Sequence, residues 1–111
     1  MHEVYWACFE RQAAAVCAVG PESVSPPHAV GLPGHWQDDA VAGAGSGFAA
    51  YAEALAGLRP PLARIQADLY CRACDIVQLA AEDGLAHAVP AQDVQPVYLR
   101  EQVAVAPRNA T

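Results

Sequence analysis

Apolar and polar positions do not alternate cleanly near the start of the chain, but the residue types there predict a hairpin. Residues 3–11 concentrate valine and aromatic side chains, which favours a strand. A weak turn at Gln12 and Ala13 leads to residues 14–19, which we expect to form a second strand paired with the first. Residues 20–34 are rich in proline and glycine, so they predict an irregular loop.

The pattern in the middle of the chain predicts a buried strand followed by a helix. A short apolar run after Asp39 ends in the glycines of residues 43–47, as expected for a strand that enters a tight turn. Apolar residues then recur near helical spacing as far as Leu58, with Ser46 as a candidate N-cap. Residues 59–64 contain prolines and predict a connector.

The strongest helical pattern covers residues 66–82. One apolar stripe runs along it, formed by Leu69, Ala73, Ile76, Val77 and Ala80. Asp68 lies near the expected N-terminal end, where the helix dipole favours a negative charge. Gly84 is a candidate for the residue that ends the helix. Beyond it we expect a loop, a short extended segment at residues 96–100 and a frayed tail.

Composition indicates one domain of a cytoplasmic protein. The chain has 111 residues without a linker or repeat, so residues 1–111 are treated as a single domain. A net charge of −6, with no lysine, argues against direct binding of nucleic acid or of an acidic membrane surface. We expect neither a membrane span nor a signal peptide. With only four cysteines, the chain is expected to work in a reducing compartment.

Cys71 and Cys74 form a C-x-x-C motif, a spacing used in redox and metal sites. A redox motif needs its first thiol exposed at a helix N-terminus, whereas the predicted helix places Cys71 several residues inside. A zinc site needs a second pair of ligands at similar spacing, and Cys8 and Cys17 lie farther apart on predicted strands. We therefore expect structural cysteines. A disulfide between Cys8 and Cys17 would need an oxidising compartment.

The other candidate sites are weaker. His28, His35, Asp38 and Asp39 would ligate a metal only if their loop made them converge, and a solvated loop is expected instead. The glycines of residues 43–47 precede a predicted helix, where backbone amides hold phosphate in other proteins, but they match no complete nucleotide motif. Tight packing explains these glycines equally well. The residue types alone thus indicate an acidic α/β domain without a catalytic set.

Four segments, taken in order, carry a resemblance to a known family. They are HEVYWACF at residues 2–9, the strand ending in GAGSG, QADLY at residues 66–70 and PVYLREQVA at residues 96–104. Together they resemble the C-terminal half of the TsaB family, also called YeaZ, whose members take part in forming threonylcarbamoyladenosine in tRNA. PVYLR is the most specific match, and residues 20–37 have no clear match. The motif residues are Glu3, Val4, Tyr5, Gly43, Gly45, Asp68, Pro96, Tyr98, Leu99 and Arg100.

The resemblance implies an α/β fold that is one half of an actin-like, RNase-H-like protein. The expected half-domain has a small, mostly antiparallel sheet with two main helices, and it lacks the N-terminal subdomain of the family. The implied role is a non-catalytic accessory subunit that acts at position 37 of tRNA by supporting the catalytic paralogue TsaD, beside the ATPase TsaE. These contacts are expected mainly through the N-terminal half, and apolar surface left uncovered would favour self-association. No catalytic residue, cofactor or metal is carried over to this chain, and the older protease label for the family finds no motif here.

Two further interpretations accompany the family one. Cys71 and Cys74 could make the chain a small thiol or metal-binding protein, and residues 43–47 could be a remnant of a nucleotide site. For the PVYLR segment we expect Tyr98 and Leu99 to pack against the domain and Arg100 to pair with a carboxylate, in preference to a contact with a partner.

Overall fold

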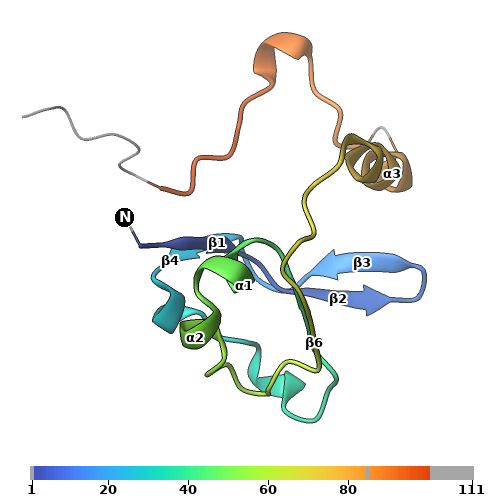
Figure 1. The fold of residues 1–111 in the computed structure, drawn as a ribbon. Coiled ribbons are helices and arrows are strands. Elements are labelled where there is room, and N and C mark those ends of the chain that lie inside the picture. The colour runs from blue at the N-terminus through green and yellow to red at the C-terminus, as the bar shows by residue number, and fades with distance from the viewer. Residues whose placement is uncertain (1, 85, 101–111) are drawn as a thin grey trace, which may run out of the picture.

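The computed structural model describes residues 2–84 and 86–100, in which the strands form three separate two-stranded sheets (Figure 1). β1 (Val4–Trp6) pairs antiparallel with β4 (Ser23–Ser25), and β2 (Phe9–Gln12) pairs antiparallel with β3 (Ala15–Ala18). β5 (Ala42–Ala44) and β6 (Arg64–Gln66) are parallel. The described chain is therefore a small α/β fold with both antiparallel and parallel pairs.

The predicted hairpin is present, but its first strand is divided. Residues 3–11 form β1 and β2 with a break at Ala7 and Cys8, because the two halves pair with different partners. β2 and β3 meet across a turn in which Ala13 has φ 56°, the left-handed conformation that a tight hairpin turn requires. The backbone N–H of Val19 donates to the Cys8 carbonyl at 2.8 Å and extends the hairpin by one further bond.

The partner of β1 lies inside the segment predicted to be an irregular loop. β4 occupies residues 23–25, and the Trp6 indole Nε1 donates to the Ser25 hydroxyl at 2.9 Å. The rest of that segment contains two short 3₁₀ helices, η1 (Pro27–Ala29) and η2 (Gly34–Trp36). Prolines and glycines thus mark the turns correctly, but they did not reveal the short strand between them.

A broken helix follows β5, as the apolar spacing predicts. α1 (Gly47–Ala50) and α2 (Ala52–Leu55) are separated at Tyr51, whose φ of −129° and ψ of 41° interrupt the helical backbone. Ser46 stands at the N-cap position, although its side chain makes no capping hydrogen bond. These helices form the crossover that joins the parallel strands β5 and β6.

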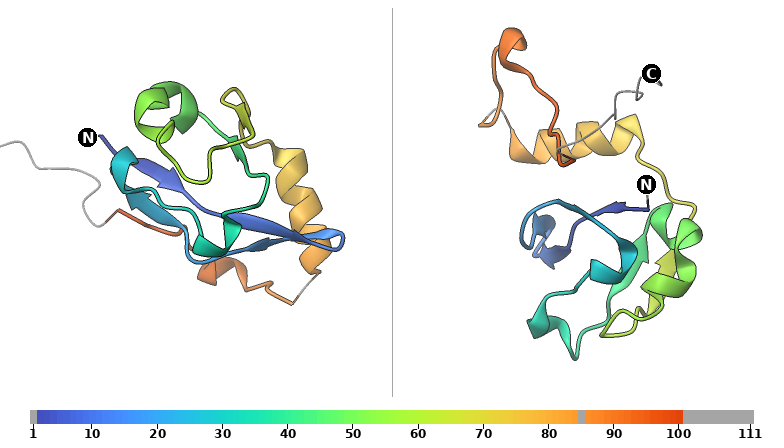
Figure 2. Two further views of the ribbon diagram at one scale, coloured as in Figure 1. Left: turned by 90° about the horizontal axis from the view of Figure 1, so that it is seen from below. Right: turned by 90° about the vertical axis from the view of Figure 1, so that its left-hand side faces the viewer.

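The strongest predicted helix begins later than expected. α3 (Ala73–Asp83) starts seven residues after position 66, because residues 64–66 pair with β5 as β6 and residues 67–72 cross to the helix. Its end agrees with the prediction, since Gly84 has φ 67° and terminates the helix. Figures 1 and 2 show α3 standing clear of the sheets. The segment that follows contains a 3₁₀ turn, η3 (Ala91–Asp93), and residues 96–100 have no regular secondary structure.

The core of the described residues is small. Its buried apolar side chains are Val4, Cys8, Trp36, Leu55 and Leu58. The chain exposes 9195 Å² of surface, whereas a compact protein of its mass exposes about 5,800 Å². The radius of gyration of 17.1 Å likewise exceeds the roughly 13 Å of a compact chain of this length. The molecule is therefore open, and many of its large apolar side chains are exposed to solvent. Among the described residues, no helix is both long and apolar enough to cross a bilayer.

Candidate functional site

The first and the last of the four family motifs, which lie far apart in the sequence, meet in the fold. The guanidinium Nε of Arg100 lies 3.3 Å from Oε1 of Glu3, and its central carbon lies 5.5 Å from the centre of the Tyr5 ring. The ion pair and the cation–π contact hold the last described residues against β1, whose Val4 is buried. The expected pairing of Arg100 with a carboxylate is confirmed.

The other residues of the C-terminal motif do not pack as predicted. Tyr98 is 76% exposed and Val97 is similarly open, while Leu99 is half-buried. Arg100, with a side chain only 19% exposed, is thus the anchor of this segment. The packing expected of Tyr98 is wrong for the described chain, because its neighbours leave the aromatic ring uncovered.

The glycines of residues 43–47 serve packing. A Cβ atom at Gly43 would lie 2.5 Å from Cζ of Phe48 and 2.9 Å from Cδ1 of Leu62, so a larger residue would displace both. Gly45 has φ 118°, a conformation that other residues rarely adopt. The Gly45 amide donates to the Gln66 carbonyl at 3.1 Å, and the Phe48 amide donates to Gly45. Both amides are engaged within the chain, and a phosphate cradle would need them free.

Asp68 does not occupy the position that the helical pattern assigned to it. It lies in the crossing segment between β6 and α3, exposed and outside the first turn of the helix. The prediction of a dipole partner at Asp68 is therefore wrong, and Asp75 is the acidic residue in the first turn of α3.

The C-x-x-C motif spans the N-terminal boundary of α3. Cys71 precedes the helix, Arg72 is the N-cap with extended backbone angles of −118° and 147°, and Cys74 lies in the first turn. Both cysteines are exposed and free. Nε of Arg72 lies 3.5 Å from Oδ2 of Asp75 in an exposed ion pair. The sequence predicted that Cys71 lies several residues inside a helix, which argued against a redox motif. In the structure Cys71 lies before the helix instead.

The remaining cysteines do not form the cross-strand disulfide considered from the sequence. All four cysteines of the chain are free. In the hairpin, Cys17 stands opposite Glu10, while the Cys8 carbonyl accepts from Val19, so the two cysteines are offset. Cys8 is buried, and this burial raises the pKa of its thiol. Cys8 is accordingly a structural cysteine.

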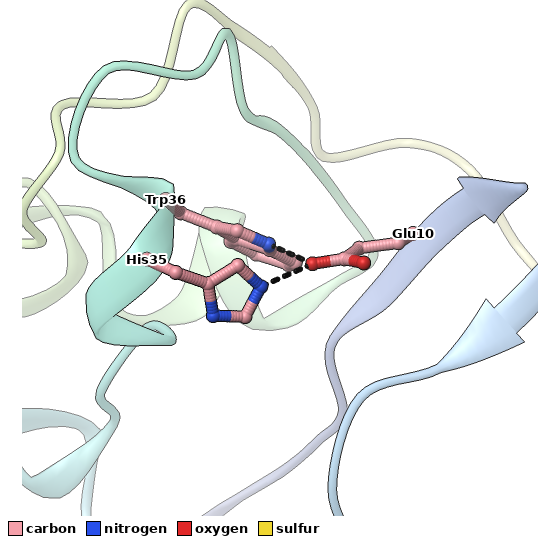
Figure 3. Close-up of polar contacts among 3 residues, drawn as sticks. All are labelled: Glu10, His35 and Trp36. Carbon is pink, nitrogen blue, oxygen red and sulfur yellow. Dashed lines mark hydrogen bonds and ion pairs between the residues drawn. The ribbon is translucent and has the colours of Figure 1, made fainter.

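A polar cluster that sequence analysis missed joins β2 to η2. Oε1 of Glu10 accepts a hydrogen bond from Nε1 of Trp36 and contacts Nε2 of His35, each at 2.5 Å (Figure 3). The hydrogen bonds from Trp36 and then from His35 lower the pKa of the Glu10 carboxyl. Because these residues are 25 and 26 positions apart, no local pattern could have paired them.

This cluster replaces the metal site that the histidines and aspartates could have formed. Within the described part of the chain, no group of three or more His, Cys, Asp or Glu side chains could hold a metal ion. His35 turns to Glu10 and does not converge with His28 or the two aspartates. The cluster instead ties the loop to the hairpin.

A large hollow lies where these segments meet. It has a volume of about 1130 Å³ and is lined by residues that lie between Val4 and Cys71 in the sequence. Val4 and Cys8, the glycines of β5 and its turn, the Glu10 cluster, Leu58 and Cys71 all contribute to its wall. Much of the wall is apolar, and it offers packing surface more than a set of reacting groups.

Comparison with known proteins supports the fold suggested by the motifs. No protein-family model matches the chain, and no curated protein does. Among solved structures, the chain is similar to a crystal structure described as an uncharacterized protein with similarity to peptidase YeaZ from Pseudomonas aeruginosa, at 33% identity and a TM-score of 0.77. The fold is YeaZ-like. The match covers 90% of this chain but only 45% of the YeaZ-like neighbour, so the chain spans less than half of that protein's length.

Proposed function

We propose that this chain is the C-terminal half-domain of a TsaB-like accessory subunit, with an actin-like fold and without catalytic activity of its own. The proposal rests on the YeaZ-like neighbour, which is 33% identical over 90% of the chain. The contact of Glu3 and Tyr5 with Arg100 supports it, since these residues belong to two of the four motifs that carry the resemblance. The subunit would support formation of threonylcarbamoyladenosine at position 37 of tRNA in the cytoplasm.

The proposed partners are a TsaD-like catalytic paralogue and a TsaE-like ATPase. We expect them to bind mainly through the N-terminal half that the family resemblance implies. The open fold supports this view, because a domain that works alone seldom leaves so many large apolar side chains in water. The exposed set includes Phe9, Ile65, Leu69, Tyr70, Ile76, Val77, Leu79 and Tyr98.

The test replaces the matched 45% of the YeaZ-like neighbour with this chain. The hybrid, the neighbour itself and the 111-residue chain would each be added to TsaD, TsaE, threonylcarbamoyl-adenylate and tRNA. We expect the hybrid to restore threonylcarbamoyladenosine to the level of the neighbour, and the chain alone to give none. A folded hybrid that leaves the reaction unsupported, beside an active neighbour, would overturn the proposal.

A hybrid carrying Arg100→Gln tests the role of the contact between the C-terminal motif and β1. It keeps a long polar side chain but loses the charge that pairs with Glu3 and faces the Tyr5 ring. We expect reduced support of the reaction together with reduced thermal stability, because the change loosens the C-terminal motif from β1. An equally stable but inactive variant would instead indicate a direct contact of Arg100 with a partner.

A further inference from the structure

The exposed C-x-x-C motif has no part in the proposed accessory role. Cys71 ends the segment that crosses from β6, and Cys74 lies in the first turn of α3. Figures 1 and 2 show α3 apart from the sheets, and within the described part of the chain Cys71 and Cys74 are both exposed. Both thiols face water, in contrast to Cys8, which is buried in the core.

The surroundings of the two thiols suit exchange chemistry better than a structural metal. A structural zinc site takes four protein ligands, and the described residues contain no group of even three candidate ligands. Cys71 also lines the large hollow, so a small molecule can approach it from that side. An exposed pair at this spacing, beside a helix N-terminus, is the arrangement of a redox dithiol.

We propose that Cys71 and Cys74 form a redox-active dithiol that reduces low-molecular-weight disulfides. The deprotonated Cys71 sulfur attacks one sulfur of the disulfide, forms a mixed disulfide and releases the first small thiol. The deprotonated Cys74 sulfur then attacks Cys71, which forms the Cys71–Cys74 disulfide and releases the second small thiol. Two electrons pass from the protein to the small disulfide, and the two protons lost by the cysteines balance the two thiols released.

The order of attack follows from the positions of the two sulfurs. Cys71 precedes the helix and borders the hollow, whereas Cys74 is held by the helical backbone of the first turn. Cys71 is therefore the residue that meets the incoming disulfide, and Cys74 is the residue that resolves the mixed disulfide.

Glutathione disulfide is the probe for the test. The reduced 111-residue chain would be incubated with it in the presence of a metal chelator, and the products identified by intact mass and peptide mapping. We expect the chain to lose two hydrogens, to retain no glutathione and to contain a Cys71–Cys74 disulfide. A chain that keeps glutathione on Cys71 or Cys74, or that forms its disulfide through Cys8 or Cys17, would overturn the proposal.

Two variants and a control separate the roles of the cysteines. Cys74→Ser should accumulate one glutathionyl group on Cys71, because the resolving sulfur is absent. Cys71→Ser should form no internal disulfide and should react more slowly than Cys74→Ser. Cys17→Ser alters a half-buried cysteine of β3 and should behave as the unaltered chain. Faster reaction at Cys74 than at Cys71 would contradict the assigned order.

A redox titration of the unaltered chain tests the proposal without any substitution. In mixtures of reduced and oxidised glutathione, a dithiol that closes on itself follows a two-electron equilibrium. We expect the fraction of the Cys71–Cys74 disulfide to follow that curve. If Cys71 and Cys74 instead become glutathionylated progressively, the two thiols react independently, and the proposed redox-active dithiol is refuted.

Discussion

At the residue scale, Glu10 carries the main polar link between the hairpin and the loop that follows it. Its Oε1 atom contacts both Trp36 and His35, which belong to a 3₁₀ turn. Trp36 is also one of the few buried side chains, so the carboxylate fixes a core residue from the polar side. An ionised carboxylate is a stronger acceptor than a neutral one, which makes the link dependent on pH.

The Glu10 link should stabilise the fold only where its carboxyl is ionised. Its hydrogen bonds with Trp36 and His35 lower the pKa of Glu10 below the ordinary 4.5, so its contribution is complete above that value. The contribution is lost as the pH falls through the lowered pKa. We therefore expect Glu10→Gln to reduce the free energy of unfolding at neutral pH, with a difference from the unaltered chain that shrinks below pH 4.5.

Urea denaturation at several pH values, followed by tryptophan fluorescence, measures that difference. Glu22→Gln alters an exposed carboxyl outside the cluster and controls for the change in net charge. If the stability difference for Glu10→Gln stays constant down to acid pH, then ionisation of the Glu10 carboxyl does not strengthen this link, and the prediction is wrong.

Gly43 should tolerate no side chain, because the space above its backbone is filled. An added methyl group would lie 2.5 Å from Phe48 and 2.9 Å from Leu62. We expect Gly43→Ala to lower the free energy of unfolding by about 1–3 kcal/mol, the usual cost of overpacking. Chemical denaturation gives the value. Gly31→Ala, at a glycine with nothing within 4 Å of the added carbon, is the control and should change stability much less.

At the element scale, α2 and α3 differ in how much tertiary packing stabilises them. α2 places Leu55 in the core, so its single turn is held by tertiary packing. α3 has an apolar stripe, but its described side chains face water. Helices of this length are marginal when they stand alone, since most helical stability in proteins comes from packing of the apolar face.

Two identical substitutions should reveal this difference. Leu55 is 6% exposed and Leu79 is 54% exposed. We expect Leu55→Ala to lower the free energy of unfolding by about 2–5 kcal/mol, and Leu79→Ala by roughly 0.5 kcal/mol or less. Denaturant unfolding of both variants under the same conditions provides the comparison. Equal losses would show that α3 is packed against another surface in solution.

At the scale of the whole molecule, the open shape is the dominant feature. The sheets, α1 and α2 gather around a small core, while α3 and residues 86–100 pass outside it (Figures 1 and 2). The contact of Arg100 with Glu3 and Tyr5 returns the end of the described chain to β1. This shape leaves many large apolar side chains exposed, among them Tyr70, Val77 and Tyr98.

The shape itself can be measured by small-angle X-ray scattering of the isolated chain. We expect a radius of gyration near 17.1 Å after extrapolation to zero concentration. A compact chain of 111 residues would give about 13 Å. A value near the compact limit would show that α3 packs back against the sheets, and the expectation for Leu79→Ala would then fail with it.

The local sequence by itself determined the elements whose stabilising signals lie within a few residues. The turn at Ala13, the glycine-bounded strand β5, the helix that starts after Ser46 and the end of α3 at Gly84 are all indicated by neighbouring residue types. The PVYLR motif also pointed to Arg100 as half of an ion pair. In each case the backbone preference or the charge acts over a short distance along the chain.

Only the tertiary structure decided the features that join distant segments. β4 and β6 are strands because β1 and β5 offer them hydrogen-bond partners, and β6 in turn delays the start of α3. That delay moved Cys71 from the expected interior of a helix to its exposed N-terminal side. The Glu10 cluster and the Glu3–Arg100 pair likewise depend on backbone paths that bring remote side chains together. Pairing across space has no signal in local residue patterns, and that is why these positions required the fold.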